Sequence, residues 1–309
     1  MSLDLTTSIA GIPLQSPITL LSGCVGFGEE MLRLENFPFS AVGAIFLKGT
    51  TLHPKAGNRL HRIAETPGGM LNAIGLQNPG AQRVVEEILP RVESLPTRLI
   101  ANIAGSTVEE YAEVARIFDQ SCVSAIEINI SCPNVKEGGA AFGSDPLVAS
   151  RVVEAVRKVT TKPVITKLSP NVTDIAQITR AVIEAGTQAL SAINTLMGMS
   201  IDVRTHQPVL GNVQGGLSGP AIKPVALLKV WQTYQVARKH GIDIVGQGGI
   251  ASGEDALSFL LVGSRAVGLG TELFQDPWAP QRVLDEMSSL MIEQNRPSIQ
   301  QWVGGLQSP

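Results

Sequence analysis

The sequence alternates between short apolar segments and longer segments with helical spacing, and it does so along its whole length. The short segments are rich in β-branched residues and end in polar or glycine-rich turns, as strands do. They lie at residues 18–22, 44–48, 98–103, 125–130, 163–168, 189–194, 242–247 and 265–269. The spacing predicts helices at 79–93, 107–119, 146–159, 173–185, 222–240 and 252–262, with a last one from about residue 278.

These repeated units predict the α/β class. No linker-like change in composition divides residues 1–309, so the prediction is one domain, a single (β/α)8 TIM barrel. An open doubly wound sheet is the alternative. Polar or glycine residues close all eight strands, and in a barrel they gather at one C-terminal mouth. An open sheet offers a crevice only at its switch point, which favours the barrel.

Two connections are much longer than the others, residues 49–78 and 195–221. Connections of this length are usually lids or binding loops. Residues 65–78 within the first are predicted to be neither strand nor helix, but they are too apolar for a solvated loop and should fold over something. Asn72 and the backbone near Gly75 and Leu76 are therefore expected to meet a small polar ligand.

Composition excludes several classes of protein. With 24 Lys and Arg against 27 Asp and Glu, the net charge is −3, so a nucleic-acid partner is not expected. Three cysteines form no CxxC pair, and the four histidines show no ligand spacing, so no metal is expected. The apolar runs are too short to cross a membrane, and no export signal is expected because the first residues carry an Asp and no Lys or Arg. A cytoplasmic location is the expectation.

The densest chemical signal runs from Glu127 to Asn134, off the end of the fourth strand. Asn129 and Asn134 offer donors and acceptors that suit a ring with alternating C=O and N–H groups, as in pyrimidines and flavins. Cys132 is a candidate general base, because its thiol needs only a modest fall in pKa to act at neutral pH. A small buried apolar cysteine is the alternative. Cys24 and Cys122 are expected to fill core space.

Lys48 and Lys167 end apolar strands, where a charge is costly to bury without an anionic partner. Each suggests a bound anion or an electron-rich ring, and an ion pair of Lys167 with Glu127 is the alternative. Gly248-Gly249 and Gly270-Thr271 follow the last two strands, where many barrels bind phosphate through loop amides.

Several long strings resemble one enzyme family, the dihydroorotate dehydrogenases, and within it the class 1B catalytic subunits. The strings here are SGCVGFG, ETPGGMLNAIGLQNPG, EINISCPNVKEGG, INTLMGMSID, GGLSGPAIKP and GGI. The resemblance runs from about Ser22 to Thr271, almost the whole chain. Small departures are Gly49 where Thr is commoner, Met197 and Ser200, and Gln247 where Met is frequent.

The resemblance implies an FMN-bearing barrel that oxidises (S)-dihydroorotate to orotate in de novo pyrimidine (UMP) biosynthesis. It implies that Cys132 removes the C5 proton. The residues that resemble substrate contacts are Lys48, Asn72, Ala73, Ile74, Gly75, Leu76, Asn129, Asn134, Asn194 and Thr195. Those that resemble flavin contacts are Ser22, Lys48, Gly49, Asn102, Asn129, Lys167, Ile193, Gly219, Gly248, Gly249, Gly270 and Thr271.

The resemblance also implies a partner subunit that carries FAD and a [2Fe-2S] cluster and passes electrons to NAD+. This chain lacks the cysteines for a cluster and a G-x-G-x-x-G after its first strand. The implied assembly has two catalytic and two electron-transfer subunits, with a homodimer of catalytic subunits at its core. Alternatives are a dihydroorotate dehydrogenase that works alone with fumarate, a flavin barrel that reduces uracil or thymine, and a barrel without chemistry that serves as a scaffold.

Overall fold

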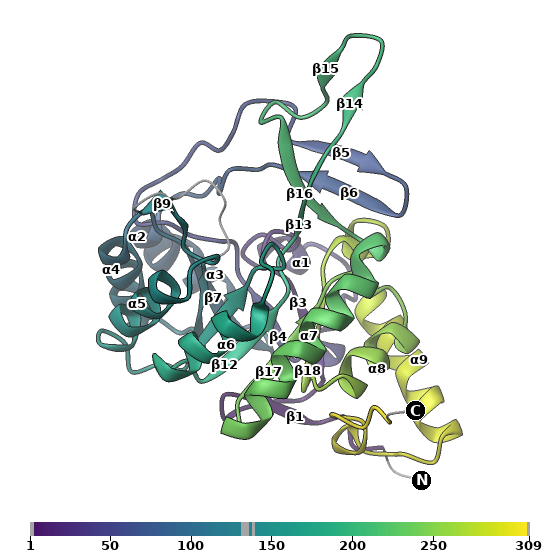
Figure 1. Ribbon diagram of the computed structural model, residues 1–309. Coiled ribbons are helices and arrows are strands. Elements are labelled where there is room, and N and C mark those ends of the chain that lie inside the picture. The colour runs from purple at the N-terminus through teal and green to yellow at the C-terminus, as the bar shows by residue number, and fades with distance from the viewer. Residues whose placement is uncertain (1–2, 131–135, 138–139, 308–309) are drawn as a thin grey trace.

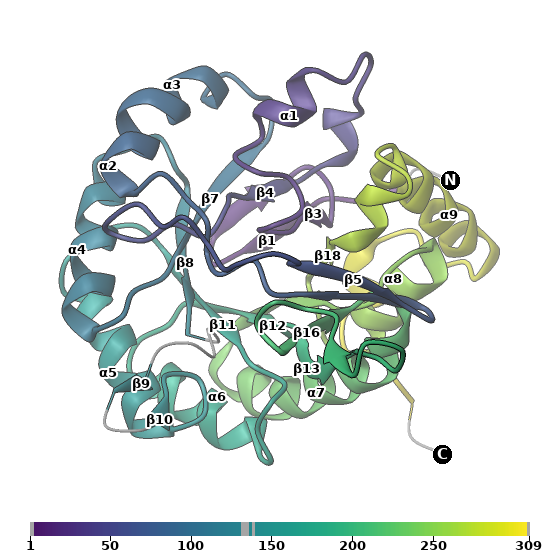
Figure 2. The ribbon, with the colours of Figure 1, turned by 90° about the horizontal axis from the view of Figure 1, so that it is seen from above.

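Eight parallel strands close into a barrel, which confirms the predicted fold class. The computed structural model of the protein describes residues 3–130, 136–137 and 140–307. Figure 2 looks down on the strands, with helices around them. In order around the barrel, the strands are β3 (Ile18–Leu20), β4 (Ala44–Phe46), β7 (Arg98–Ile103), β8 (Ala125–Asn129), β11 (Val164–Leu168), β12 (Ala189–Ala192), β17 (Asp243–Gln247) and β18 (Ala266–Leu269), and β18 pairs with β3.

The helices form an outer layer whose apolar faces pack on the barrel. Helix ends follow the chemistry of the sequence, since Thr107, Asp145 and Ser252 accept backbone N–H groups as N-caps. The helices outside the 79–93 segment are α1 (Glu29–Leu32), α4 (Val108–Asp119), α5 (Pro146–Arg157), α6 (Ile175–Glu184), α7 (Lys223–Ala237), α8 (Gly253–Leu261) and α9 (Ala279–Glu293). Short 3-10 turns are η1 (Phe39–Ala41), η3 (Pro220–Ile222), η4 (Arg238–His240), η5 (Thr271–Phe274) and η6 (Ile299–Gln301).

The predicted helix at 79–93 is not uniform. It divides into α2 (Ala81–Arg83), a π-helical turn η2 (Val84–Ile88) and α3 (Leu89–Val92). Pro90 lies in the first turn of α3 and has no N–H to donate to the preceding turn. The wider π-helical turn lies directly ahead of it, and such turns occur mostly as single-turn interruptions of α-helices.

A hairpin that the sequence did not predict closes the bottom of the barrel. Its strands are β1 (Thr7–Ile9) and β2 (Ile12–Leu14), and Figure 1 shows β1 below the barrel strands. Ile9 and Leu14 pack against the innermost barrel side chains, among them Phe46 and Ile165, in one buried cluster. The barrel interior is therefore a packed core at this end.

The two long connections join above the barrel as one antiparallel sheet, in the order β13-β16-β6-β5. Figure 1 shows it on top of the barrel, and Figure 2 shows β5 crossing the mouth. We call it the lid sheet; its strands are β5 (Ile63–Thr66), β6 (Gly69–Asn72), β13 (Leu196–Met199) and β16 (Gln214–Ser218). Small paired strands are β9 (Lys136–Glu137) with β10 (Ala140–Ala141), and β14 (Ile201–Asp202) with β15 (Gln207–Pro208).

The lid sheet corrects the prediction that residues 65–78 contain neither strand nor helix. Residues 63–72 form a hairpin whose turn holds Pro67 and Gly68. Gly68 has φ 72°, the left-handed conformation that a type II turn requires at its third position. Pro-Gly between two short apolar runs was the missed signal. The expectation that this segment folds over something is confirmed.

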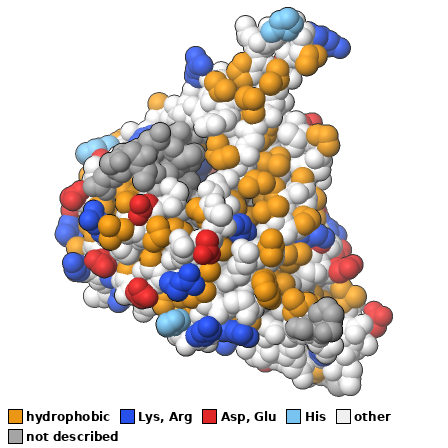
Figure 3. Space-filling model, viewed as in Figure 1, with side chains coloured by type: hydrophobic (Ala, Val, Ile, Leu, Met, Phe, Trp, Pro, Cys, Tyr) orange, Lys and Arg blue, Asp and Glu red, His pale blue; other side chains and the backbone are white. Residues whose placement is uncertain are grey.

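The surface carries apolar side chains as well as charges. Figure 3 shows them gathered over α7 and toward the protruding β14–β15 hairpin. Leu228 and Trp231 on α7 and Ile201 and Val203 near β14 are among the exposed large hydrophobic residues. Among the described residues, no helix combines the length and the apolar character that a membrane span requires.

Candidate active site

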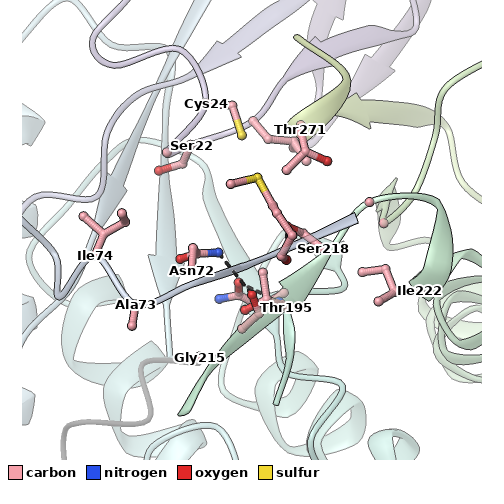
Figure 4. A pocket seen from close by; sticks show the side chains of 18 of the residues that line it. Ser22, Cys24, Asn72, Ala73, Ile74, Thr195, Gly215, Ser218, Ile222 and Thr271 are labelled. Carbon is pink, nitrogen blue, oxygen red and sulfur yellow. Dashed lines mark hydrogen bonds between the residues drawn. The ribbon is translucent and has the colours of Figure 1, made fainter. Parts of the chain in front are cut away.

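A cavity of about 300 Å³ lies at the C-terminal mouth of the barrel, under the lid sheet. This volume is at the lower end of the usual range for ligand sites. Figure 4 shows side chains around it from several parts of the chain: Ser22 and Cys24 after β3, Asn72 from β6 and Thr271 after β18. Because parallel strands end at the same mouth, residues far apart in sequence meet here.

Most of the predicted site residues line this cavity. They are Ser22, Lys48, Gly49, Asn72, Ala73, Ile74, Gly75, Leu76, Asn129, Lys167, Ile193, Asn194, Thr195, Gly219, Gly248, Gly249, Gly270 and Thr271. Asn102 is not in the lining; it is buried on β7. Cys132 and Asn134 lie outside the described residues, so the structure does not place the predicted base.

Amide side chains are linked across the cavity. Asn194 Nδ2 donates to Asn129 Oδ1 at 3.2 Å, and Asn194 Oδ1 accepts from the Thr195 N–H at 2.8 Å. On the lid sheet, Asn72 Nδ2 donates to the Gly216 carbonyl at 3.3 Å. These bonds join β6 to β16 and the end of β12 to β8. Amide donors and acceptors of this kind suit a planar polar ring.

The barrel floor beneath the cavity is a polar layer. Two residues after the innermost apolar layer, the strands place Asn102, Glu127, Lys167, Ser191 and Gln247, all nearly inaccessible. Inward positions of a barrel are usually filled by bulky apolar residues. The Glu127 carboxylate accepts from Asn102 Nδ2 and from Ser191 Oγ. Hydrogen bonds thus connect three of the eight strands through one buried carboxylate.

Two cationic side chains and a thiol lie close together on one part of the cavity wall. Burial lowers the pKa of Lys48 below its usual value, and the neighbouring Cys24 acts in the opposite direction. Burial also raises the pKa of Cys24 to about 11, although Lys167 and Lys48 both oppose this. The Cys24 thiol is therefore neutral near pH 7, and Lys48 favours an anionic ligand, which would offset the cost of burying its charge.

Comparison with known proteins agrees with this arrangement. The dihydroorotate dehydrogenase family model matches residues 4–291. The chain belongs to the dihydroorotate dehydrogenase family. A relative from Geobacter sulfurreducens, named dihydroorotate dehydrogenase B (NAD(+)), catalytic subunit, is 51% identical over 305 residues, 98% of each chain. Proteins of the same name from Citrifermentans bemidjiense and Geobacillus kaustophilus are 50% and 48% identical, covering 98% and 97% of this chain and 98% and 95% of their own.

The cysteine predictions need correction in this member of the dihydroorotate dehydrogenase family. Cys24 does not simply fill core space, because it lines the cavity, and Cys122 is exposed on the surface. Cys24 follows Ser22-Gly23, a turn that carries the chain away from β3 at the mouth. Position immediately after a barrel strand was the available signal for Cys24. Cys122 follows α4, in the connection to β8.

Sequence reasoning also missed amides on the loops. Asn171 lines the cavity; its Nδ2 donates to the Thr195 carbonyl at 3.0 Å and its Oδ1 accepts from the Met197 N–H at 2.9 Å. Asn58, Asn212 and Gln214 line the cavity from the two long connections. The signal was present, since each lies in or just after a segment predicted to reach the mouth.

The cavity suits a flavin cofactor on two observations. Within the described part of the chain, Gln247 has no hydrogen-bond partner at either amide atom, and Asn102 has none at Oδ1. Such buried orphaned groups suit a ring that carries donors and acceptors. Gly248 and Gly249 have φ values of 129° and 81°, and a Cβ at Gly249 would lie 2.7 Å from the Gly219 carbonyl oxygen. Both positions therefore favour glycine, a residue whose backbone lets a phosphate approach closely.

The part of the chain that the structure describes contains no cluster of metal-ligating side chains. No group of three or more His, Cys, Asp or Glu residues is placed to hold an ion there.

Proposed function

We propose that this protein oxidises (S)-dihydroorotate to orotate in pyrimidine biosynthesis, as the catalytic subunit of an NAD+-linked enzyme. The observation that carries the proposal is the lidded cavity at the barrel mouth, where linked asparagines and two lysines face one space. Dihydroorotate is a six-membered ring that carries alternating C=O and N–H groups along one side and one carboxylate. Full-length relatives named dihydroorotate dehydrogenase B support the same reaction.

FMN is the proposed cofactor of this chain. When bound, FMN supplies the hydride acceptor for the reaction. The residues proposed to hold it are the predicted flavin contacts that line the cavity, with Asn102 and Gln247 in the floor beneath. Gly248, Gly249, Gly270 and Thr271 hold the phosphate through loop backbone, and Lys167 stabilises negative charge at the polar edge of the ring.

The substrate is held between the barrel end and the lid sheet. Asn129, Asn194 and Asn72 bind the ring edges, and Lys48 binds the carboxylate, with Asn134 as a further contact proposed from sequence. Cys132 takes the proton from C5, which needs a site closed to water. The lid sheet supports this closure because it already covers the mouth.

The proposed partner is an electron-transfer subunit with FAD and a [2Fe-2S] cluster, and NAD+ is the final acceptor. The words "catalytic subunit" and "NAD(+)" in the names of the relatives support it. The exposed apolar side chains over α7 support contact with another chain, since contiguous apolar patches commonly mark interfaces. We propose two copies of each subunit around a homodimer of this chain.

Purification from the native cell, with visible spectra of what copurifies, tests the assembly. FMN, FAD and the iron–sulfur cluster should appear together, and NAD+ should be reduced only by the whole complex. The chain produced alone should bind FMN and should not reduce NAD+ with dihydroorotate. Efficient turnover of the single chain with fumarate would contradict the proposed partner.

Replacement of the proposed base tests the chemistry. Cys132→Ala should retain FMN, but reduction of the cofactor by dihydroorotate should fall by about 100-fold or more, as expected for loss of a general base. Stopped-flow absorbance of the flavin measures this step directly. Cys122→Ala is the matched control, because it removes an exposed thiol on the surface. Normal flavin reduction in Cys132→Ala would refute the role.

A further inference from the structure

Arg282 on α9 makes hydrogen bonds to several segments behind the mouth of the barrel. Its Nη2 donates to Glu272 Oε1 at 2.7 Å, its Nε to Asp276 Oδ2 at 2.9 Å, and its Nη1 to the Ala251 carbonyl at 3.0 Å. The Arg282 side chain is only partly exposed, at 39%. One side chain thus contacts both the loop after β17 and the loop after β18.

Those two loops carry the proposed phosphate site. Ala251 comes two residues after Gly249, and Glu272 follows Gly270-Thr271 directly in η5. Glu272, Gly249 and Gly270 all line the cavity, while Arg282 does not. A shift of either loop would therefore change the distance between the backbone groups that would contact a phosphate.

Glu286, also on α9, holds the first residue of α8. Glu286 Oε1 pairs with Arg282 Nη1 at 3.4 Å, and its Oε2 accepts from the Gly253 N–H at 2.6 Å. Gly253 is the first residue of α8, directly after the loop that begins at Gly248. The Arg282–Glu286 pair therefore fixes this loop from its distal end.

Guanidinium geometry suits this task. Arg presents a rigid planar fork of donors. Acceptors that bond to different arms of the fork are therefore fixed relative to one another. A lysine keeps the charge but carries its three donors on one rotatable nitrogen atom, so it cannot reproduce the planar fork. Groups that orient metal ligands without touching the metal commonly change its affinity by about 10- to 100-fold, and we expect an effect at the lower end of that range for the loops supported here.

We propose that Arg282 is a positioning residue for the phosphate end of the cofactor. It holds the loops at 248–252 and 270–274 at the spacing that a phosphate group requires, and it has no part in holding the flavin ring. The inference rests on the proposed FMN site.

Binding of two flavins to the apoprotein tests this inference. FMN and riboflavin differ only in the phosphate, so the ratio of their affinities isolates the phosphate contribution. In Arg282→Gln, fluorescence titration should show FMN affinity about 10-fold weaker and riboflavin affinity within twofold of the unsubstituted protein. Arg282→Lys should recover part of the loss, and Glu286→Gln should give a smaller loss of the same kind.

Arg265→Gln is the matched control. Arg265 pairs with Asp243 at 2.7 Å and its side chain is 37% exposed, so it is an equally exposed arginine in an ion pair at the opposite end of the barrel strands. Its ratio of FMN to riboflavin affinity should not change. Thermal unfolding of each variant shows whether it is folded, and Arg282→Lys and Glu286→Gln carry the test where Arg282→Gln does not fold.

The outcomes separate this inference from the function on which it rests. An unchanged affinity ratio in the Arg282 variants, or an equal loss of both flavins, overturns the positioning role while leaving the FMN site intact. Failure of the unsubstituted protein to bind either flavin overturns the proposed cofactor itself.

Discussion

Gln247 is one of the residues at which the sequence departs from the family pattern, and among the residues that the structure describes its buried side-chain amide lacks hydrogen-bond partners. It is 1% exposed, and within the described chain both of its amide atoms lack hydrogen-bond partners. Burying an amide without partners costs about 1–3 kcal/mol. The barrel floor should therefore be less strained when a cofactor that pairs with this amide is bound than when the cavity is empty.

Substitution of Gln247 by Met, an apolar residue of similar volume, should reveal this difference. We expect the apoprotein to become more stable to urea by about 1 kcal/mol, and this gain to shrink or reverse when FMN is present. Urea unfolding with and without FMN measures both values. Gln82→Met, on an exposed face of α2, should change neither by more than about 0.5 kcal/mol. An equal gain in both states would contradict contact with the cofactor.

The charge on Lys48 should give orotate binding a pH dependence. Burial lowers the pKa of this lysine, and the carboxylate of orotate requires the protonated form. Affinity should therefore fall as the pH rises through this lowered pKa, earlier than the usual lysine value of about 10.4 predicts. Calorimetric titration across the alkaline range measures it. Lys48→Arg should remove the inflection from that range, and an unchanged profile would assign it to another group.

The lid sheet is the element that most affects ligand binding. It has a small core of its own, made of Ala64, Leu71, Ala73 and Leu210, separate from the two clusters of the barrel. A small separate core can open without unfolding the domain. The mouth can therefore admit ligand while the barrel remains closed.

Leu210→Ala should weaken the lid and leave the barrel nearly unchanged. Leu210 is fully buried, and removing such a side chain costs about 2–5 kcal/mol locally. We expect the KM for dihydroorotate to rise several-fold and hydrogen exchange to increase in β5 and β6. Leu190→Ala, equally buried in the barrel wall, should instead lower the temperature of global unfolding. A similar loss of global stability in both variants would show that lid and barrel unfold together.

The whole molecule separates stability from binding along the barrel axis. The β1–β2 hairpin packs the lower end, and the polar layer and cavity occupy the upper end. In barrels of this kind the C-terminal face carries the chemistry and the opposite face contributes to stability. A substitution should therefore show one kind of effect or the other according to its height in the barrel.

Ile9→Ala tests this separation from below. Ile9 is 4% exposed and packs under the barrel interior, so its truncation should cost about 2–5 kcal/mol of global stability. FMN affinity at a temperature where the protein remains folded should stay within twofold. Urea unfolding and fluorescence titration give the two values. Ile201→Ala, at a 56% exposed position, should change neither, and a large loss of FMN affinity in Ile9→Ala would contradict the separation.

The barrel could be predicted from sequence because its strands and helices are specified by local patterns. Runs such as 163–168 are short and rich in β-branched residues, and they are followed by helices with recognisable caps, as at Asp174 and Ser252. The lid sheet could not be predicted in the same way, because β6 pairs with β16 across more than a hundred residues. The strand ends predicted many of the cavity residues. Cys24 and Asn171 also follow barrel strands, which was a signal for them, but their place in the cavity wall depends on how the loops fold.

One consequence of the shared lid concerns how such a mouth can be redesigned. The lid sheet takes β5 and β6 from the connection after the second barrel strand, and β13 and β16 from the connection after the sixth. A chimaera that received only one of these connections would leave the edge of β6 or of β16 unpaired and exposed to water. The two insertions must therefore be transplanted, or evolve, as a single module.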